Sequence, residues 1–361
     1  MTEEQKLNEI RQRIDEIDRQ VQDLLNRRAE AAQEVARIKL ASDPNAVFYR
    51  PEREAQVLRA VKARNQGPLD DESVARLFRE IMSECLALEM PLKVAYLGPE
   101  GTFTQAAAMK HFGHAVTTVP LAAISDVFQE VENGICDYGV VPVENSSEGV
   151  VSHTLDMFLN STLRICGEVT MRIHHNLLGT CKDLQQIKVV YSHQQSLAQC
   201  RGWLDRHLPA VERIPVGSNA EAARRAARSG DAAAIAGAMA AELYGLGVLV
   251  PNIEDEASNT TRFLVIGQQA VPPSGDDKTS LLLSTRNEAG GLYQLLAPLA
   301  DHGISMTRIE SRPSRRGNWD YVFFVDINGH RDDPGVAPAL DDLKRHAGMY
   351  KELGSYPKAV L

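Results

Sequence analysis

Six charged side chains within the first 90 residues have the types and the spacing to hold a small anionic substrate. Arginine and lysine donate strong hydrogen bonds to carboxylates, whereas a carboxyl group accepts from a hydroxyl or, when protonated, donates to an oxygen. Four cations beside two carboxylates suit a compact anion better than they suit a structural core. The six candidates are Arg11, Arg28, Lys39, Arg53, Glu54 and Glu89.

A second group of candidates in the middle of the chain carries hydroxyl, amide and imidazole groups. Polar clusters follow apolar segments at residues 102–104, 144–147, 192–194 and 218–219. Each cluster falls where a strand of an α/β fold would end and a helix would begin. Because helix N-termini attract anions at that edge of a sheet, we expect the clusters to meet around a ligand.

One long helix must position the first group. Residues 2–40 contain no Gly or Pro, and apolar residues recur in two interleaved heptad series. The seam residues are Leu7, Ile14, Val21, Arg28 and Val35 in one series, and Ile10, Ile17, Leu24, Ala31 and Ile38 in the other. At ~1.5 Å per residue the helix would be roughly 58 Å long, and its apolar seam needs a partner helix. We expect a second copy of the chain to supply that helix.

Arg28 interrupts the seam, where a guanidinium is costly to bury unless an anion meets it. Lys39 lies ~16 Å further along the axis and about 20° away in helical phase, so the two cations can hold one dianion between them. Arg11 lies ~25 Å from Arg28 along the same helix and can join the site only from an antiparallel partner. The alternative is that Arg28 sets the register of a coiled coil.

The remaining elements indicate a multidomain protein. Helices at residues 51–65 and 71–89 complete an all-α module, and apolar strands then alternate with helices up to residue 270. That alternation is typical of a mostly parallel, doubly wound sheet, and roughly 180 residues with two groups of strands also fit two lobes around a cleft. After a linker at 271–277, the order strand, helix, strand, strand, helix, strand is that of a ferredoxin-like βαββαβ module. The predicted boundaries are 1–91, 92–270 and 278–361.

The length, composition and net charge of the sequence argue against several classes of function. The 361 residues are 43% hydrophobic and 24% charged, as in ordinary globular proteins. A net charge of −9 argues against sequence-independent nucleic-acid binding. No signal peptide opens the chain and no apolar run approaches ~18 residues, so we expect a cytoplasmic protein without membrane contact. Five scattered cysteines and the absence of nucleotide- or metal-binding motifs predict free thiols, no metal and no cofactor.

The helical module resembles the all-helical chorismate mutase family, whose members are intertwined dimers. The resemblance rests on the order and spacing of the six charged candidates. It implies rearrangement of chorismate to prephenate, with Arg28 and Arg11 of the other subunit holding the two carboxylates. It further implies that Lys39 donates to the ether oxygen, Arg53 orients the substrate and Glu54 takes its ring hydroxyl.

The module departs from the best-known members of that family at three positions. Cys85 in the substrate site stands where serine is common, Arg50 where aspartate is often found, and Glu89 where many members carry glutamine. The ether oxygen needs donors, and an ionised carboxylate cannot donate. We therefore predict that Glu89 acts protonated, so that mutase activity falls as the pH rises through its pKa. The alternative for Glu89 is a solvated carboxylate at a helix end.

Residues 92–267 resemble prephenate dehydratase. The motifs are GPEGTFT at 98–104, PVENS at 142–146, SHQQ at 192–195, QC at 199–200 and NTTRF at 259–263. The resemblance implies a two-lobed fold like that of solute-binding proteins. It also implies that prephenate loses carbon dioxide and its ring hydroxyl to become phenylpyruvate, with aromatisation driving the reaction.

The same resemblance assigns roles to residues in these motifs. Thr261 is the donor to the departing hydroxyl, and Arg262 balances the charge of the substrate. The other predicted substrate contacts are Thr102, Thr104, Asn145, Ser146, Ser192 and His193. The alternatives are turn or capping roles for the hydroxyl residues and a structural ion pair for Arg262. We interpret His174 and His175, in an apolar neighbourhood, as structural.

The final module resembles an ACT domain, a common amino-acid sensor. GGL at 290–292 stands where relatives carry Gly-Ala-Leu, and ESRP at 310–313 matches phenylalanine-regulated members. The resemblance implies that L-phenylalanine binds at a subunit interface. The implied effector site consists of Gly290, Gly291, Leu292, Glu310, Ser311 and Arg312.

The order of the three modules matches the bifunctional chorismate mutase/prephenate dehydratase family of phenylalanine biosynthesis. We therefore expect a homodimer or larger homo-oligomer that converts chorismate through prephenate to phenylpyruvate under feedback inhibition by L-phenylalanine. Two alternatives stay open. One is a monofunctional dehydratase with an inactive mutase module, and the other is a non-catalytic aromatic-acid sensor on a coiled-coil dimer.

Overall fold

The first part of the protein is helical, as the sequence predicts. The computed structural model describes residues 2–44, 46–285, 289–314 and 321–361. Its first elements are α1 (Glu3–Ser42), α2 (Pro51–Arg64) and α3 (Asp71–Glu89). A capping box of Thr2 and Gln5 starts α1, and Asp70 starts α3 by accepting from the Ser73 N–H at 2.8 Å. The start and end signals in the sequence therefore define these helices.

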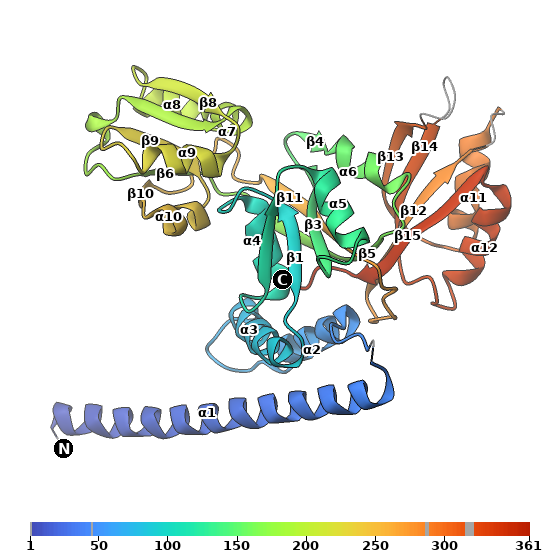
Figure 1. Ribbon diagram of the computed structural model, residues 1–361, viewed down its shortest axis with the longest axis horizontal. Helices are drawn as coiled ribbons and strands as arrows, with labels where there is room; N and C mark the ends of the chain where they lie inside the picture. Colours follow the sequence, from blue (N-terminus) through green and yellow to red (C-terminus); the bar gives the residue numbers. More distant parts are fainter. Residues whose placement is uncertain (1, 45, 286–288, 315–320) are drawn as a thin grey trace.

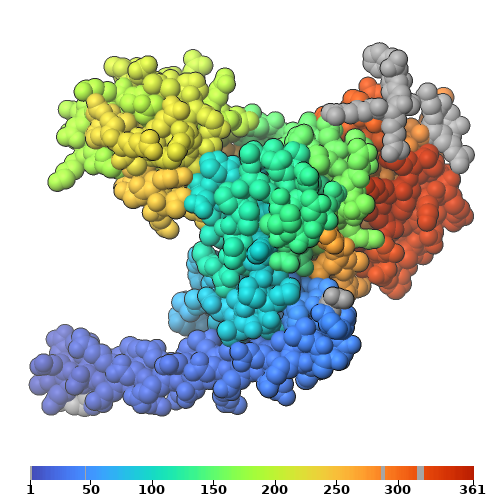
Figure 2. All heavy atoms as spheres, in the orientation of Figure 1, coloured from blue at the N-terminus to red at the C-terminus, as the bar shows by residue number. Residues whose placement is uncertain are grey.

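α1 extends away from the rest of the molecule as a rod, which Figures 1 and 2 show along the lower edge of the view. Its large apolar seam residues are 46% to 61% exposed, whereas Ala36, near α3, is buried. An amphipathic helix with so wide an apolar face is unstable alone in water. The seam therefore has the character of a surface that another helix covers.

The first lobe of the central part is a sheet with strand order β2-β1-β3-β11-β5, to which β4 pairs at β3. Its strands are β1 (Lys93–Leu97), β2 (Thr117–Leu121), β3 (Tyr138–Asn145), β4 (Gly149–Val150), β5 (Arg164–Arg172) and β11 (Thr260–Gly267). Its helices are α4 (Phe103–Phe112), α5 (Ile124–Glu132) and α6 (Ser152–Phe158). Apolar residues of α5, α6, β3 and β11 pack together into the core of this lobe.

The second lobe is a smaller sheet with strand order β10-β6-β9-β7-β8. Its strands are β6 (Asn176–Gly179), β7 (Val189–His193), β8 (Glu212–Val216), β9 (Ala232–Ala236) and β10 (Gly247–Val250). Its helices are α7 (Gln194–Gln199), α8 (Arg201–His207), α9 (Asn219–Ala226) and α10 (Ala238–Tyr244), with a 3-10 turn η1 (Leu184–Gln186). Every residue of β9 is buried, as expected for a strand covered on both faces.

The prediction of a mostly parallel sheet is wrong, and the two-lobed interpretation is confirmed. In the first lobe β1 pairs in parallel with β2 and β3, but β11 runs antiparallel between β3 and β5. In the second lobe β6 is antiparallel to β9 and β10. The chain leaves the first lobe after β5 and returns through β11, and that return sets the direction of β11. Strands β2, β4, β6 and β10 were not predicted.

The C-terminal domain has the predicted βαββαβ order. Its elements are β12 (Asp277–Ser284), α11 (Gly291–Asp301), β13 (Met306–Pro313), β14 (Tyr321–Asn328), α12 (Ala337–His346) and β15 (Met349–Pro357). The strands form an antiparallel sheet in the order β13-β14-β12-β15, with α11 and α12 packed on it. This domain and the second lobe lie on opposite sides of the first lobe in Figure 2.

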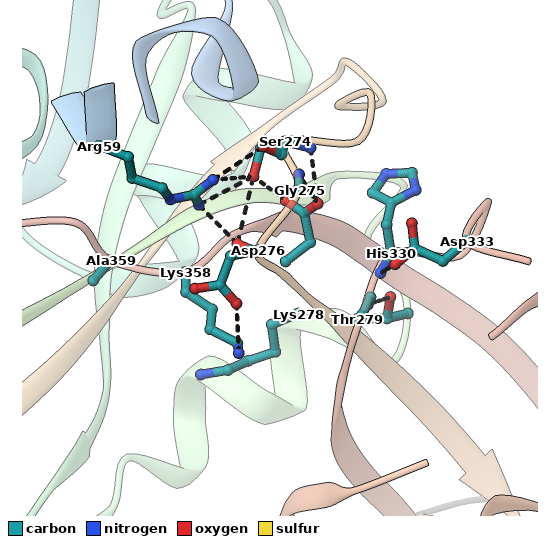
Figure 3. Close-up of polar contacts among 12 residues, drawn as sticks. Arg59, Ser274, Gly275, Asp276, Lys278, Thr279, His330, Asp333, Lys358 and Ala359 are labelled. Carbon is teal, nitrogen blue, oxygen red and sulfur yellow. Dashed lines mark hydrogen bonds and ion pairs between the residues drawn. The ribbon is translucent and has the colours of Figure 1, made fainter. Parts of the chain in front are cut away.

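Arg59 of α2 ties the helical module to the segment that precedes β12, and Figure 3 shows this junction. Arg59 Nη1 donates to the Ser274 carbonyl at 3.0 Å, and its Nη2 donates to the Asp276 carbonyl at 2.8 Å. Lys358, after β15, pairs with the Asp276 carboxylate at 2.7 Å. The end of the chain then packs on α2 and α3 through Val360, Leu361, Leu58, Ala75 and Met82. The helical and C-terminal parts are therefore in direct contact.

Candidate active sites

A cleft of about 580 Å³ lies between the two lobes. Its walls come from the start of α4, the end of β3 and the start of β11 in the first lobe, and from α7 and the start of α9 in the second. Five predicted residues line it, namely Thr102, Thr104, Asn145, His193 and Thr261. Three others, Ser146, Ser192 and Arg262, lie outside its lining. Five of the eight residues predicted for this site therefore come together at the cleft.

Asn145 holds Thr261 as a hydrogen-bond acceptor. The two residues are opposite each other in the β3–β11 register. Asn145 Oδ1 accepts from the backbone N–H groups of Ser147 at 3.0 Å and Glu148 at 3.1 Å, which fixes the orientation of the amide. Its Nδ2 therefore donates to Thr261 Oγ1 at 2.7 Å. Among the described residues Thr261 makes no other side-chain hydrogen bond, so its proton is available to the cleft.

The same fixed amide orders a chain of side chains that crosses between the lobes. Asn145 Nδ2 also donates to Asn259 Oδ1 at 2.8 Å, so Asn259 presents its own Nδ2 to Gln199 Oε1 at 3.0 Å. Gln199 Oε1 then accepts from His175 Nε2 at 2.8 Å. Because the backbone donors fix Asn145, the donor and the acceptor of every hydrogen bond in this chain are determined. His175 therefore carries its proton on Nε2.

The sequence analysis did not predict that Asn259, Gln199 or His175 belongs to the site. Asn259 and Gln199 stand inside the motifs NTTRF and QC, which was the available signal. His175 was interpreted as structural; it is 2% exposed, yet it lines the cleft. Burial lowers its pKa, although the Gln199 contact opposes that shift, so the imidazole is neutral. No local pattern in the sequence distinguishes it from its neighbour His174.

Several predicted contact residues also hold the backbone around the cleft. Thr102 and His193 are the N-cap residues of α4 and α7. Ser192 is fully buried and lies within 3.0 Å of Asn219 Oδ1 and 2.9 Å of the Ile235 carbonyl. Ser146 Oγ accepts from the Thr260 N–H at 2.9 Å. Ser192 and Ser146 therefore shape the site from outside it.

Arg262 lies on the face of β11 that is turned away from the cleft. Its Nε pairs with Glu168 Oε2 at 2.8 Å, its Nη1 with Asp326 Oδ2 at 2.6 Å, and its Nη2 donates to the Tyr356 hydroxyl at 3.0 Å. Two of these partners belong to the C-terminal domain. The structure therefore places Arg262 at a domain boundary, which matches the structural alternative and not the predicted contact with substrate.

Near the end of α3, Glu89 faces the two cations predicted to share its site. Burial raises the pKa of Glu89, and Lys39 and Arg28 lie close enough to oppose that rise without cancelling it. Lys39 Nζ donates to the Val47 carbonyl at 3.3 Å and lies 5.2 Å from the centre of the Phe48 ring. Glu89 is therefore within electrostatic reach of both Lys39 and Arg28 of α1.

Glu54 belongs to the same cluster, and Arg79 holds it. Burial raises the pKa of Glu54, while Arg79 and then Arg28 lower it. Arg79 Nη1 lies 2.5 Å from Glu54 Oε2 and also donates to the His111 carbonyl of α4. Arg79 is 7% exposed and was not predicted. It connects this cluster to the first lobe.

The remaining predicted residues of the helical cluster differ in their surroundings. Cys85 is 6% exposed, whereas Arg53 and Arg11 are exposed in the single chain. Arg50 pairs with the buried Glu52. Because α1 is one continuous helix, Arg11 remains ~25 Å from Arg28, as its rise per residue requires.

The predicted effector residues occupy two places in the C-terminal domain. Gly290 has φ +79° directly before α11, a conformation that suits glycine. Leu292 is 40% exposed, and Glu310, Ser311 and Arg312 lie on β13, the edge strand. Arg312 also reaches the first lobe, where its Nη2 lies 3.0 Å from Asp156 Oδ1. β14 separates β13 from β12 within one sheet.

Comparisons with known proteins agree with this geometry along the whole chain. Residues 10–90 match the family Chorismate mutase type II, residues 94–271 match Prephenate dehydratase, and residues 279–345 match the ACT domain. A bifunctional chorismate mutase/prephenate dehydratase of Stutzerimonas stutzeri is 59% identical over 100% of both chains. One of Escherichia coli K12 is 33% identical over 99% of this chain and 97% of its own.

A solved structure supports the fold of the central and C-terminal parts. Prephenate dehydratase of Arthrobacter aurescens in complex with L-Phe is 35% identical, with a TM-score of 0.68 over 74% of this chain and 90% of that chain. Together these features define a multidomain enzyme that joins a helical mutase, a two-lobed dehydratase and an ACT domain. The chain belongs to the bifunctional chorismate mutase/prephenate dehydratase family. It accordingly combines both activities, consistent with phenylalanine biosynthesis and feedback regulation.

Within the described residues, no helix combines the length and the apolar character that crossing a bilayer requires. In the same part of the chain, no group of three His, Cys, Asp or Glu side chains is arranged to hold a metal ion. All five cysteines are buried and free.

Proposed function

We propose that prephenate binds in the cleft between the lobes and that Thr261 donates to its ring hydroxyl. The C–O bond then breaks, and the departing hydroxide is stabilised by the Thr261 hydrogen bond and takes up a proton from solvent to leave as water. The bond between the ring and its carboxylate also breaks. Carbon dioxide leaves, and the electron pair of that bond completes the aromatic ring. The observation that carries this proposal is the fixed direction of the hydrogen bond from Asn145 to Thr261, at 2.7 Å. It leaves the Thr261 proton for the substrate.

The two carboxylates of prephenate suit two of the helices that begin at the cleft. α4 begins after Thr102 in the first lobe, and α9 begins after Ser218 in the second. Helix N-termini carry partial positive charge and free N–H groups. Thr104 and His193 add polar contacts from the two walls.

The mutase proposal uses the cluster beside α1. Arg28 and Arg11 of a second copy hold the two carboxylates of chorismate, Lys39 and protonated Glu89 donate to the ether oxygen, and Glu54 takes the ring hydroxyl. Arg53 and Cys85 complete the substrate site. No proton transfer is needed, because positioning and stabilisation of developing negative charge supply the rate. The raised pKa of Glu89 supports its role as a donor.

Replacing Glu89 tests that role through the pH dependence of the mutase. Activity that needs protonated Glu89 is present below its pKa and falls about tenfold for each pH unit above it. Burial has already raised this pKa, and a bound dianion that occupies Arg28 and Lys39 raises it further. We expect Glu89→Gln, which donates at every pH, to flatten the profile of kcat.

The matched control for this measurement is Glu84→Gln, on the exposed side of the same helix. Its kcat profile for chorismate is expected to follow that of the wild type. A profile for Glu89→Gln that still falls at the wild-type pH would show that another group titrates, and Glu89 would not be the donor.

We assign residues 1–91 to the mutase, 92–270 to the dehydratase and 278–361 to the ACT domain. L-Phenylalanine binds the ACT domain between Gly290–Leu292 of one subunit and the β13 edge of another. Exposed apolar side chains at both places, including Tyr293 at 79% and Ile309 at 39%, support an interface there. The exposed seam of α1 supports a dimer through the mutase. Buried free thiols suit work in the reducing cytoplasm.

A coupled assay tests both activities together. Chorismate is added to the protein, and prephenate and phenylpyruvate are followed with and without L-phenylalanine. We expect both products in sequence, with less phenylpyruvate when phenylalanine is present. Phenylpyruvate formed from added prephenate but not from chorismate would identify an inactive mutase. Phenylalanine binding without either product would identify a non-catalytic sensor.

A further inference from the structure

Neighbouring strands of the first lobe carry two pairs of residues on opposite faces. Thr261 lies beside Asn145 in the β11–β3 register, and Arg262 lies beside Glu144. Successive side chains of a strand point to opposite faces of the sheet. The first pair lines the cleft, and the second pair forms ion pairs with the ACT sheet. The register shifts directly after Arg262, so this end of β11 is separated from the regular ladder.

The ACT sheet meets Arg262 and Glu144 with two charges of its own. Asp326 of β14 and Arg308 of β13 are partners in the strand register. Asp326 Oδ2 lies 2.6 Å from Arg262 Nη1, and Arg308 Nε lies 3.1 Å from Glu144 Oε2. Opposite charges therefore alternate around the four positions. We call Arg262, Glu144, Arg308 and Asp326 the charge square.

The buried side of the charge square has little freedom to rearrange alone. The side chains of Arg262 and Asp326 are 14% and 7% exposed. Ser280 Oγ donates to Asp326 Oδ1 at 2.5 Å and lies 2.7 Å from the Tyr356 hydroxyl, which also accepts from Arg262. Burial, the largest single cause, raises the pKa of Asp326, but Arg262, Ser280 and Arg308 together outweigh burial and leave that pKa below its ordinary value. A buried pair of this kind is sensitive to loss of either partner.

β13 links the charge square to the effector motif. Arg308 and Arg312 lie on this strand, with Glu310 and Ser311 between them. Arg312 reaches Asp156 of α6, and Arg308 reaches Glu144 of β3. Arg308 Nη2 is also buried without a hydrogen-bond partner among the described residues. A shift of β13 therefore moves two arginines that both form ion pairs with the dehydratase domain.

We propose that Arg262 and Glu144 are positioning residues through which the ACT domain sets the hydrogen bond from Asn145 to Thr261. Effector binding at β13 displaces Arg308 and Asp326, and these carry Glu144 and Arg262 with them. Because Asn145 and Thr261 are the next residues on the same two strands, their contact changes in turn. The inference rests on the proposed function, since it takes L-phenylalanine as the effector and Thr261 as the donor.

The competing explanation is that the charge square only fastens the two domains together. The two explanations differ in what each variant changes. If the charge square only fastens the domains, a variant has a lower unfolding temperature, but the enzyme that remains folded responds to phenylalanine as the wild type does. A positioning role changes kcat and the response to phenylalanine while phenylalanine still binds.

The experiment uses Glu144→Gln in the full-length protein, because this carboxylate is 41% exposed and the neutral isostere keeps its shape. Asp326→Asn is the second variant, and its greater burial makes loss of folding a separate concern that the unfolding temperature reports. The matched control is Lys351→Gln. Lys351 joins the ACT domain to the Phe158 and Ser161 carbonyls at 2.8 and 2.6 Å, away from β3 and β11.

Five quantities are measured for each protein: kcat and KM for prephenate, phenylalanine affinity by calorimetry, the fold-change of dehydratase activity at saturating phenylalanine, and the unfolding temperature. Allosteric coupling is typically ~5- to 150-fold, and we expect it to fall below about 3-fold in Glu144→Gln while phenylalanine still binds. We expect the basal kcat to fall as well, with KM nearly unchanged. The double variant Glu144→Gln/Arg308→Met is expected to add little to either single variant, because both remove the same contact.

Wild-type coupling in Glu144→Gln, together with a lowered unfolding temperature, would overturn the inference and leave only a fastening role. Equal loss of coupling in Lys351→Gln would overturn it too, because any domain contact would then suffice. If phenylalanine fails to bind the wild type, the proposed effector is wrong and the inference falls with it. If it binds and inhibits the wild type and every variant alike, the proposed function stands and this inference alone fails.

Discussion

Mixing two inactive variants, Arg11→Ala and Arg28→Ala, is expected to restore mutase activity. Each substitution removes a cation that holds one substrate carboxylate, and loss of one such group costs about 10²- to 10³-fold in rate. If each site takes Arg28 from one subunit and Arg11 from the other, a heterodimer has one intact site and one doubly damaged site. An equal, randomly exchanged mixture should recover about a quarter of wild-type activity, as the symmetry of a two-fold dimer requires.

The measurement is the initial rate of chorismate loss by each homodimer and by the mixture after subunit exchange. Native mass spectrometry with one tagged chain verifies that heterodimers are present. Dehydratase activity on added prephenate is the internal reference and should stay near the wild-type value throughout. Arg13→Ala, two positions from Arg11 and exposed on α1, is the matched control and should keep mutase activity. A verified heterodimer without recovery would mean that each site lies within one chain.

Thr261→Val is expected to abolish most dehydratase activity while the mutase continues. Valine keeps the shape of the side chain and removes the hydroxyl that donates to the leaving group. Loss of a donor of this kind costs about 10²- to 10³-fold in kcat. Thr261→Ser, which keeps the hydroxyl, should retain much of the activity. With chorismate as substrate, the valine variant should accumulate prephenate at the wild-type mutase rate.

Asn145→Asp tests the direction of the hydrogen bond that supports this role. An ionised aspartate can only accept, so the Thr261 hydroxyl would donate to it and not to the substrate. We expect a loss of kcat comparable to that of Thr261→Val, despite an almost unchanged shape. Thr260→Val, the preceding residue on β11, is the matched control, because its hydroxyl donates to the Ser258 carbonyl. Full activity in Asn145→Asp would show that Thr261 does not act as the donor.

Local sequence patterns were sufficient for α1, for the ACT domain and for much of the cleft. The heptad series predicted one long helix with an apolar seam, and the structure has both features, the seam being exposed in the single chain. Residues 102, 145 and 193 come from segments far apart in the chain, yet they were expected together because strand ends meet at one edge of a sheet, whereas Thr261 was placed by the family resemblance. These features depend on periodicity and on chain order.

Local sequence patterns could not predict the direction of each strand or the face of the sheet to which each side chain points. Thr261 and Arg262 are adjacent in one motif, and the sequence could not say which of them faces the substrate. The antiparallel insertion of β11 between β3 and β5 decides it. That pairing depends on contacts between residues about 100 positions apart, which carry no local signature. His175 and Arg79 were missed for the same reason.

The sequence by itself determined which chemical groups are present, which helices and strands carry them, and that α1 has an apolar face. Those properties follow from the local periodicity of the side chains and from capping and turn residues. Only the tertiary structure decided that Thr261 turns to the cleft and Arg262 to the ACT domain. The physical reason is that a strand has two faces, and long-range pairing selects which face meets the ligand.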